Sequence, residues 1–308
     1  MGHIFSYIVE PGFLSSQPVR TALLVGTVVA ITSGVVGVLT VIRGQSFAGH
    51  SLADVATTGG AGAFLIGISQ FWGFLIAGVV AATAMEGIGV QRRRGRDVAT
   101  GVVLGAALGA AALFLYLDTQ QSSTTGASFT ILFGSMFVIS PDTVPALIAS
   151  GAVALAVIAV LSRVLLMTAL SPEIAAARGV PVRAVGAAYL AALAVAVSLS
   201  AVAIGAVLST ALLIGPAATA LRLASSPGKA MAAAAGTGTA ATWIGVLLAY
   251  DSFYWPPDQR GWPVSFFVVA LVLIAYLLSH ARRPRRRPGA RAEPATTQQE
   301  EAPACSPA

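Results

Sequence analysis

Long apolar runs alternate with short polar segments along most of this 308-residue chain. A helix that crosses a bilayer needs about 20 consecutive, mostly apolar residues. Nine runs meet that description to within a few residues: 20–42, 47–68, 71–90, 98–117, 144–166, 185–205, 207–224, 230–249 and 263–279. The pattern predicts an all-α membrane protein with about nine transmembrane helices in one transmembrane domain over residues 20–280.

The composition agrees with this pattern. Hydrophobic residues make up 56% of the chain and charged residues 10%, and the mean hydropathy is +0.82. A soluble domain carries about 25% charged residues, so this chain cannot cover a surface that faces water on all sides. Abundant glycine and alanine, in contrast, let transmembrane helices approach one another closely.

The basic residues lie at the ends of the apolar runs and indicate the orientation. With the N-terminus outside, nine crossings place Arg43 and the clusters 92–96, 163–183, 222–229 and 282–291 on the cytoplasmic side. Cytoplasmic loops carry an excess of Lys and Arg, so the C-terminus is expected to be cytoplasmic as well. The net charge of +6 is then a topology signal, and we expect no nucleic-acid partner.

The two ends of the chain differ from the apolar part. Residues 1–19 are expected to be an extracytoplasmic segment without the pattern of a cleavable signal peptide, so the first span would direct insertion. Residues 281–308 are rich in proline, arginine and polar residues, which is typical of a disordered basic tail. The only cysteine, Cys305, lies there, so no disulfide can form within one chain. No G-x-x-x-x-G-K-[ST] motif occurs, which argues against an enzyme that binds ATP through a P-loop.

One further apolar segment, "ILFGSMFVISPDTV" (131–144), is too short to span a bilayer. We expect a half-helix that dips into the membrane and is buried by protein, because exposed irregular backbone is not tolerated in lipid.

His50 and Asp54 are an ionisable pair inside the second apolar run. Residues four apart share one face of a helix. A carboxylate at the bilayer centre costs at least about 2.5–3.5 kcal/mol and usually marks an ion or proton path. Imidazole nitrogen and carboxylate oxygen also suit a divalent cation such as Zn²⁺ or Mn²⁺. The other interpretation is that the two side chains bond to each other and hold helices together.

Helix-breaking residues follow this pair and recur in a later span. Gly59 and Gly60 can kink the second span or admit a close neighbour, and Pro216 can bend the span 207–224. These three residues have two interpretations: simple helix packing, or a role in gating a translocation path.

The cytoplasmic segment "SPEIAAARGVPV" (171–182) has the signals of a short helix. Ser171 is a candidate N-cap, Pro172 occupies the first helical position, Glu173 lies in the first turn and Gly179 is a candidate C-cap. Such a helix suits contact with a soluble partner, although a plain interhelical loop is the other interpretation.

Together, these segments resemble the zinc/manganese-type metal permeases of ABC transporters. The likeness runs in order from about residue 12 to residue 280 and is carried by 19–67, "ILFGSMFVISPDTV", "SPEIAAARGV" (171–180) and "VLSTALLIGPAATALRLA" (207–224). It implies a homodimeric permease of the plasma membrane, related in fold to the vitamin B12 and siderophore importers. It also implies two cytoplasmic ATPase subunits, an extracytoplasmic metal-binding protein, and a coupling helix at 171–180. The transported Zn²⁺ or Mn²⁺ would be cargo, with no permanently bound cofactor.

The second span departs from the usual family pattern Gly-Asp-x-Leu-x-His-Ala. Here it reads "GHSLADV" (49–55), which exchanges the histidine and the aspartate. One imidazole and one carboxylate a turn apart remain, so the resemblance implies transient metal contact for His50 and Asp54. Ser135 stands where the family often has an aspartate after Phe133-Gly134.

Other functions use the same residues differently. A proton-coupled secondary transporter would use His50 and Asp54 as a relay and would need no ATPase. An ABC permease for a chelated metal or a small organic cargo, and a membrane scaffold that recruits partners through its tail, are further possibilities.

Overall fold

The structure, a computed structural model, describes residues 13, 15–87, 96–122, 126–134, 136–255 and 261–281. Apart from Ala281, which ends the last helix, the predicted tail lies outside these residues, as does most of the N-terminal segment. Every regular element in the described residues is a helix, as predicted. The α-helices are α2 (Gln17–Ile42), α3 (Ser46–Leu65), α4 (Gln70–Gly87), α5 (Arg96–Ser122), α6 (Gly126–Phe133), α7 (Val144–Leu170), α8 (Pro172–Ala177), α9 (Val182–Ile204), α10 (Ala206–Leu223), α11 (Pro227–Asp251) and α12 (Val264–Ala281). Three short 3-10 helices are η1 (Met136–Val138), η2 (Pro141–Thr143) and η3 (Ser252–Tyr254).

All nine predicted runs fall on helices, but length and apolar composition qualify fewer as membrane spans. Within the described residues, six segments are long and apolar enough: α2, η2 with α7, α9, α10, α11 and α12. The helix α4 is apolar but shorter over Gln70–Glu86. An all-helical protein with several membrane spans is therefore established, and nine crossings stay a prediction.

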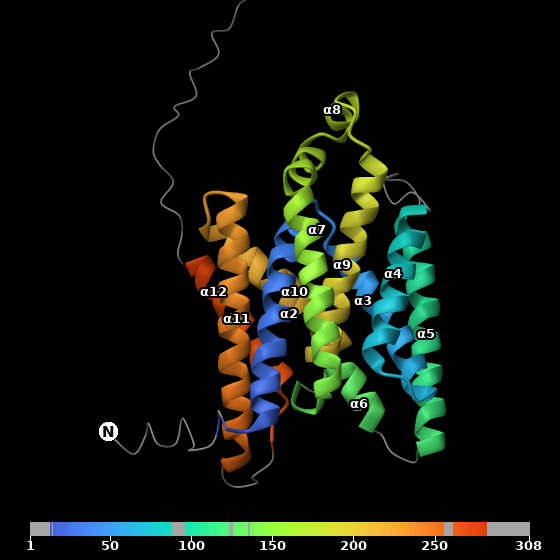
Figure 1. The fold of residues 1–308 in the computed structure, drawn as a ribbon, viewed down its shortest axis with the longest axis vertical. Helices are drawn as coiled ribbons and strands as arrows, with labels where there is room; N and C mark the ends of the chain where they lie inside the picture. Colours follow the sequence, from blue (N-terminus) through green and yellow to red (C-terminus); the bar gives the residue numbers. More distant parts are fainter. Residues whose placement is uncertain are drawn as a thin grey trace, which may run out of the picture.

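The long helices run side by side, with α8 at one end of the bundle and α6 at the other (Figure 1). We call these the α8 end and the α6 end. The helices α3, α4 and α5 form one side, α11 and α12 form the other, and α2, α7, α9 and α10 lie between them (Figure 1).

The core lies where α2 and α9 meet their neighbours. Tyr189 and Leu193 of α9 and Leu39 of α2 are fully buried. A side chain at Gly37 of α2 would overlap the carbonyl oxygen of Leu213 in α10, so glycine sets how closely these two helices pack. Small residues at helix contacts are typical of membrane bundles.

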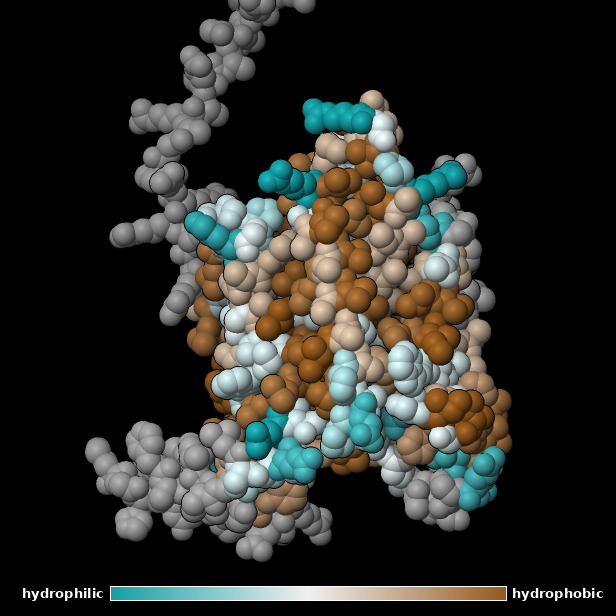
Figure 2. Space-filling model, in the orientation of Figure 1, coloured by the Kyte–Doolittle hydropathy of each residue, from teal (hydrophilic) through white to brown (hydrophobic). Residues whose placement is uncertain are grey.

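The face of the bundle seen in Figure 2 is apolar across its middle. Figure 2 shows hydrophobic side chains over the central part of the visible face and hydrophilic side chains toward both ends. The helix α7 exposes Val153 and Val160, at 62% and 80% of their surface. An apolar belt between two polar ends is the surface that a bilayer requires.

The segment 131–144 differs from the single half-helix that the sequence predicts. The helix α6 ends at Phe133, and the 3-10 helices η1 and η2 follow. The break occurs at Gly134, which has a φ of 72° and packs against the backbone of Gly205, whose φ is 90°. Gly205 separates α9 from α10, so two chain breaks meet where a side chain on either glycine would collide with backbone.

Candidate functional site

The helix α3 brings His50 and Asp54 together, as the i, i+4 spacing predicts. The Nε2 atom of His50 lies 3.5 Å from the Oδ2 atom of Asp54. The side chain of Asp54 is 14% exposed and that of His50 is 49% exposed. The pair thus lies at the surface of the chain, with the carboxylate more deeply set than the imidazole.

A third residue orients the imidazole. The Nδ1 atom of His50 lies 3.1 Å from the hydroxyl oxygen of Thr210 in α10. This contact occupies Nδ1 and leaves Nε2 facing Asp54. Gly49, next to His50, lets the side chain of Leu213 in α10 approach α3 closely. Sequence reasoning missed Thr210, whose only local signal is a hydroxyl in the apolar run 207–224.

The geometry of the pair allows a cation to be shared between the two side chains. Metal–ligand distances of about 2.0–2.2 Å place two ligand atoms of one tetrahedral ion about 3.4 Å apart. The measured separation of 3.5 Å is close to that value. Among the described residues, no group of three or more His, Cys, Asp or Glu side chains is placed to hold a metal. Two protein ligands favour weak, reversible contact over tight capture.

The three predicted bending residues lie in packed surroundings. A side chain at Gly59 would overlap the carbonyl oxygen of Gly73 in α4, and one at Gly60 would meet the ring of Phe74. Both glycines therefore bring α3 and α4 together within a continuous α3. Pro216 is buried inside α10, which runs unbroken from Ala206 to Leu223. A gating role for these residues stays a prediction.

The segment 171–180 forms the predicted short helix, α8, which projects at one end of the bundle (Figure 1). The Ser171 hydroxyl accepts a hydrogen bond from the amide of Ile174 at 3.4 Å, Pro172 is the first helical residue and Glu173 lies in the first turn. The C-cap is Arg178, one residue before the predicted Gly179. Gly179 has a φ of 78°, which turns the chain back after the helix.

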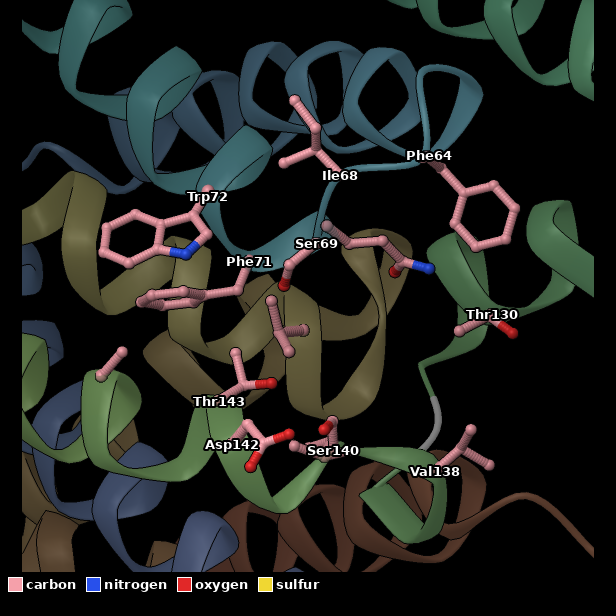
Figure 3. A pocket seen from close by; sticks show the side chains of 15 residues that line it. Phe64, Ile68, Ser69, Phe71, Trp72, Thr130, Val138, Ser140, Asp142 and Thr143 are labelled. Carbon is pink, nitrogen blue, oxygen red and sulfur yellow. The ribbon is translucent and has the colours of Figure 1, made fainter.

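The opposite end of the bundle holds a cavity of about 790 Å³. Figure 3 shows Asp142, Ser140 and Thr143 on one side of this cavity and Ser69, Phe71 and Trp72 on the other. These residues come from the α3–α4 connection, the start of α4, and the 3-10 helix η2 with the residue before it. The lining also includes Thr130 of α6, and α6 lies at the end of the bundle away from α8 (Figure 1).

Two solved structures with this fold are PsaBC and a metal-chelate type ABC transporter. PsaBC from Streptococcus pneumoniae in complex with Fab matches with a TM-score of 0.75 and 24% identity, over 90% of this chain and 95% of that chain. A metal-chelate type ABC transporter in an inward-facing conformation matches with a TM-score of 0.66 and 14% identity, over 85% of each chain. At these identities the likeness supports the fold alone.

Sequence relatives cover most of the same region. The manganese import system permease protein ScaB of Streptococcus parasanguinis is 30% identical over 233 residues, which are 75% of this chain and 81% of ScaB. The manganese transport system membrane protein MntC of Halalkalibacterium halodurans is 30% identical over 210 residues, 68% of this chain and 71% of MntC. The profile of the ABC 3 transport family matches residues 15–280. The chain is therefore a multi-pass membrane protein that belongs to the ABC 3 transport family.

Proposed function

We propose that this protein is the permease subunit of an ABC importer for divalent metal ions, with Mn²⁺ as the first candidate and Zn²⁺ as the second. The observation that carries the proposal is the His50–Asp54 pair on α3 of a chain that belongs to a transport family. Relatives named as proteins of manganese import or manganese transport systems favour Mn²⁺.

The pair acts as a transient contact on the translocation path. An ion that passes His50 and Asp54 exchanges part of its hydration shell for one nitrogen and one carboxylate oxygen. Conduction requires binding that is favourable enough for entry and weak enough for release. Two ligands, completed by water, satisfy that requirement better than a closed four-ligand site.

In a homodimer, the second copy would enclose the translocation path on the side of α3 that is exposed in one chain. The His50 side chain is about half exposed on the protomer, at a helix face that would otherwise meet lipid. Polar groups in transmembrane segments normally face a bundle interior or a water-filled cavity. A second copy packed over α3 and α10 would shield the pair and supply further oxygen or nitrogen ligands.

The two ends of the bundle suit the two kinds of partner. In the proposed orientation the α8 end is cytoplasmic, and α8 presents Ile174, 55% exposed, to an ATPase subunit. Ser171, Pro172, Glu173 and Gly179 hold the shape of this contact helix. The cavity beside Asp142 at the α6 end would receive the metal-loaded binding protein.

The test uses the permease with its ATPase and binding protein in proteoliposomes. We expect uptake of radiolabelled Mn²⁺ that requires ATP and the binding protein, and that excess Zn²⁺ inhibits. Uptake driven by a proton gradient without ATP would instead support the secondary transporter that the same His–Asp pair could form. Uptake of a metal chelate, with none of the free ion, would replace the free-metal cargo by the chelated one.

A further inference from the structure

Arg43 is a half-buried cation at the corner between α2 and α3. Its main-chain amide donates to the carbonyl of Leu39, Gly44 follows with a φ of 63°, and the amide of Gln45 donates to the carbonyl of Thr40 at 2.9 Å. The chain therefore reverses within three residues, and α3 starts at Ser46. His50 lies about one helical turn after that start.

The guanidinium group of Arg43 joins this corner to α7. Its Nη1 atom donates to the hydroxyl of Thr168 at 2.9 Å and to the carbonyl oxygen of Leu165 at 3.2 Å. Its Nε atom faces the side-chain oxygen of Gln45 at 3.4 Å. Charge-assisted hydrogen bonds of this kind are about twice as strong as neutral ones. Thr168 is in the last turn of α7, so Arg43 bonds directly to the part of α7 that leads into α8.

The same guanidinium is held from a third helix. It stacks over the ring of Tyr189 in α9, 4.8 Å from the ring centroid, and the Tyr189 hydroxyl donates to Thr40 in α2 at 2.9 Å. Burial lowers the pKa of Arg43, and the neighbouring Tyr189 and Glu86 oppose that shift. An arginine stays charged in proteins, so the group keeps its full set of donors.

The last turn of α7 and the helix α8 are joined by direct contacts. The amide of Ser171 donates to the carbonyl of Met167 at 3.1 Å, and the Nη1 atom of Arg178 lies 3.8 Å from the sulfur of Met167. Ala175 of α8 is fully buried beneath the exposed face of that helix. A push on α8 therefore reaches Leu165 and Thr168 without an intervening flexible loop.

From these contacts we propose that Arg43 is a positioning residue that transmits movement of α8 to the metal pair, by holding the α2–α3 corner against the last turns of α7. The inference rests on the proposed function. It assigns to Arg43 the link between the helix that faces the ATPase and the helix that carries His50 and Asp54. In this proposal Arg43 acts through the α2–α3 corner and not by binding the transported metal.

The test compares matched conservative substitutions in the complete importer. Arg43→Lys keeps the charge but loses the planar fork and the stacking on Tyr189. Arg20→Lys, on the exposed part of α2 near the α6 end, is the control. The measured quantity is the number of Mn²⁺ ions imported per ATP hydrolysed in proteoliposomes, together with the amount of assembled complex and its thermal unfolding.

We expect Arg43→Lys to assemble and to keep ATP hydrolysis stimulated by the loaded binding protein, while ions imported per ATP fall about tenfold, within the usual range of coupling between sites. Thr168→Val, which removes one acceptor, should lower the ratio about threefold. A purely structural role would reduce the amount of folded complex and leave the ratio unchanged in what remains.

The outcomes separate this inference from the proposed function. If the wild-type complex imports Mn²⁺ with ATP and both Arg43→Lys and Thr168→Val keep its ratio, the inference about Arg43 is wrong and the function stands. If the wild-type complex imports no metal with ATP, the proposed function fails, and with it the coupling role. Should Arg43→Lys fail to assemble, the ratio measured for Thr168→Val decides the question.

Discussion

Polar side chains behave differently at the α3–α10 contact and at the α2–α9 contact. In the buried α2–α9 contact the hydroxyls of Ser33 and Ser200 lie 2.7 Å apart, and Ser200 also bonds to the carbonyl of Ala196 at 3.0 Å. Both side chains are fully buried. At the α3–α10 contact, His50 is half exposed and reaches Asp54 only at 3.5 Å.

The difference separates structure from transport. A fully buried hydroxyl that bonds to its neighbours is not accessible to a ligand, so its role is to stabilise the packing of helices. An imidazole and a carboxylate at 3.5 Å form a weak mutual contact and keep lone pairs free for a cation. Substitutions at the two contacts should therefore separate loss of transport from loss of stability.

The largest effect is expected for the metal pair. Asp54→Ala and His50→Ala should each lower Mn²⁺ uptake more than about 100-fold. Substitution of residues that only orient metal ligands already lowers metal affinity or activity about 10–100-fold, and a ligand itself should matter more. Thermal unfolding of the purified permease should shift little, because the 3.5 Å contact contributes little to stability. Uptake and unfolding measured on the same preparations test both statements.

His280→Ala is the matched control, because His280 is exposed at the end of α12, away from α3. It should leave uptake unchanged. If both pair variants instead unfold at a clearly lower temperature and the folded fraction transports normally, His50 and Asp54 hold helices together and the site assignment fails.

Much of the fold follows from local sequence signals, since all nine apolar runs are helical and α8 begins at the cap residues that predict it. The features that escaped prediction depend on residues distant along the chain. Thr210 meets His50 across 160 positions, and Arg43 meets Thr168 across 125. The break after α6 likewise depends on Gly205, which no property of the segment 131–144 indicates. Periodicity and capping report what one helix does, whereas these contacts arise only when helices pack.

A smaller effect is expected for Thr210, which orients the imidazole. Thr210→Val keeps the volume and removes the oxygen that faces Nδ1 of His50. The ring is then free to rotate away from Asp54, so the Mn²⁺ concentration for half-maximal uptake should rise about tenfold. Thr210→Ser, which keeps the hydroxyl, should restore most of the affinity. Equal loss in both variants would mean that the methyl packing of Thr210 matters and its oxygen does not.

The smallest effect is expected for Ser33, on the other side of the comparison. Ser33→Ala removes one partner of Ser200, which still donates to Ala196. Hydrogen bonds between membrane helices average about 0.6 kcal/mol, so stability should fall by about that amount and Mn²⁺ uptake should stay at the wild-type level. Unfolding of Ser33→Ala, Ser200→Ala and the double variant gives the energy of this bond alone. If Ser33→Ala lowers uptake as much as Thr210→Val does, bonded core hydroxyls also serve transport, and the proposed division between the two contacts is wrong.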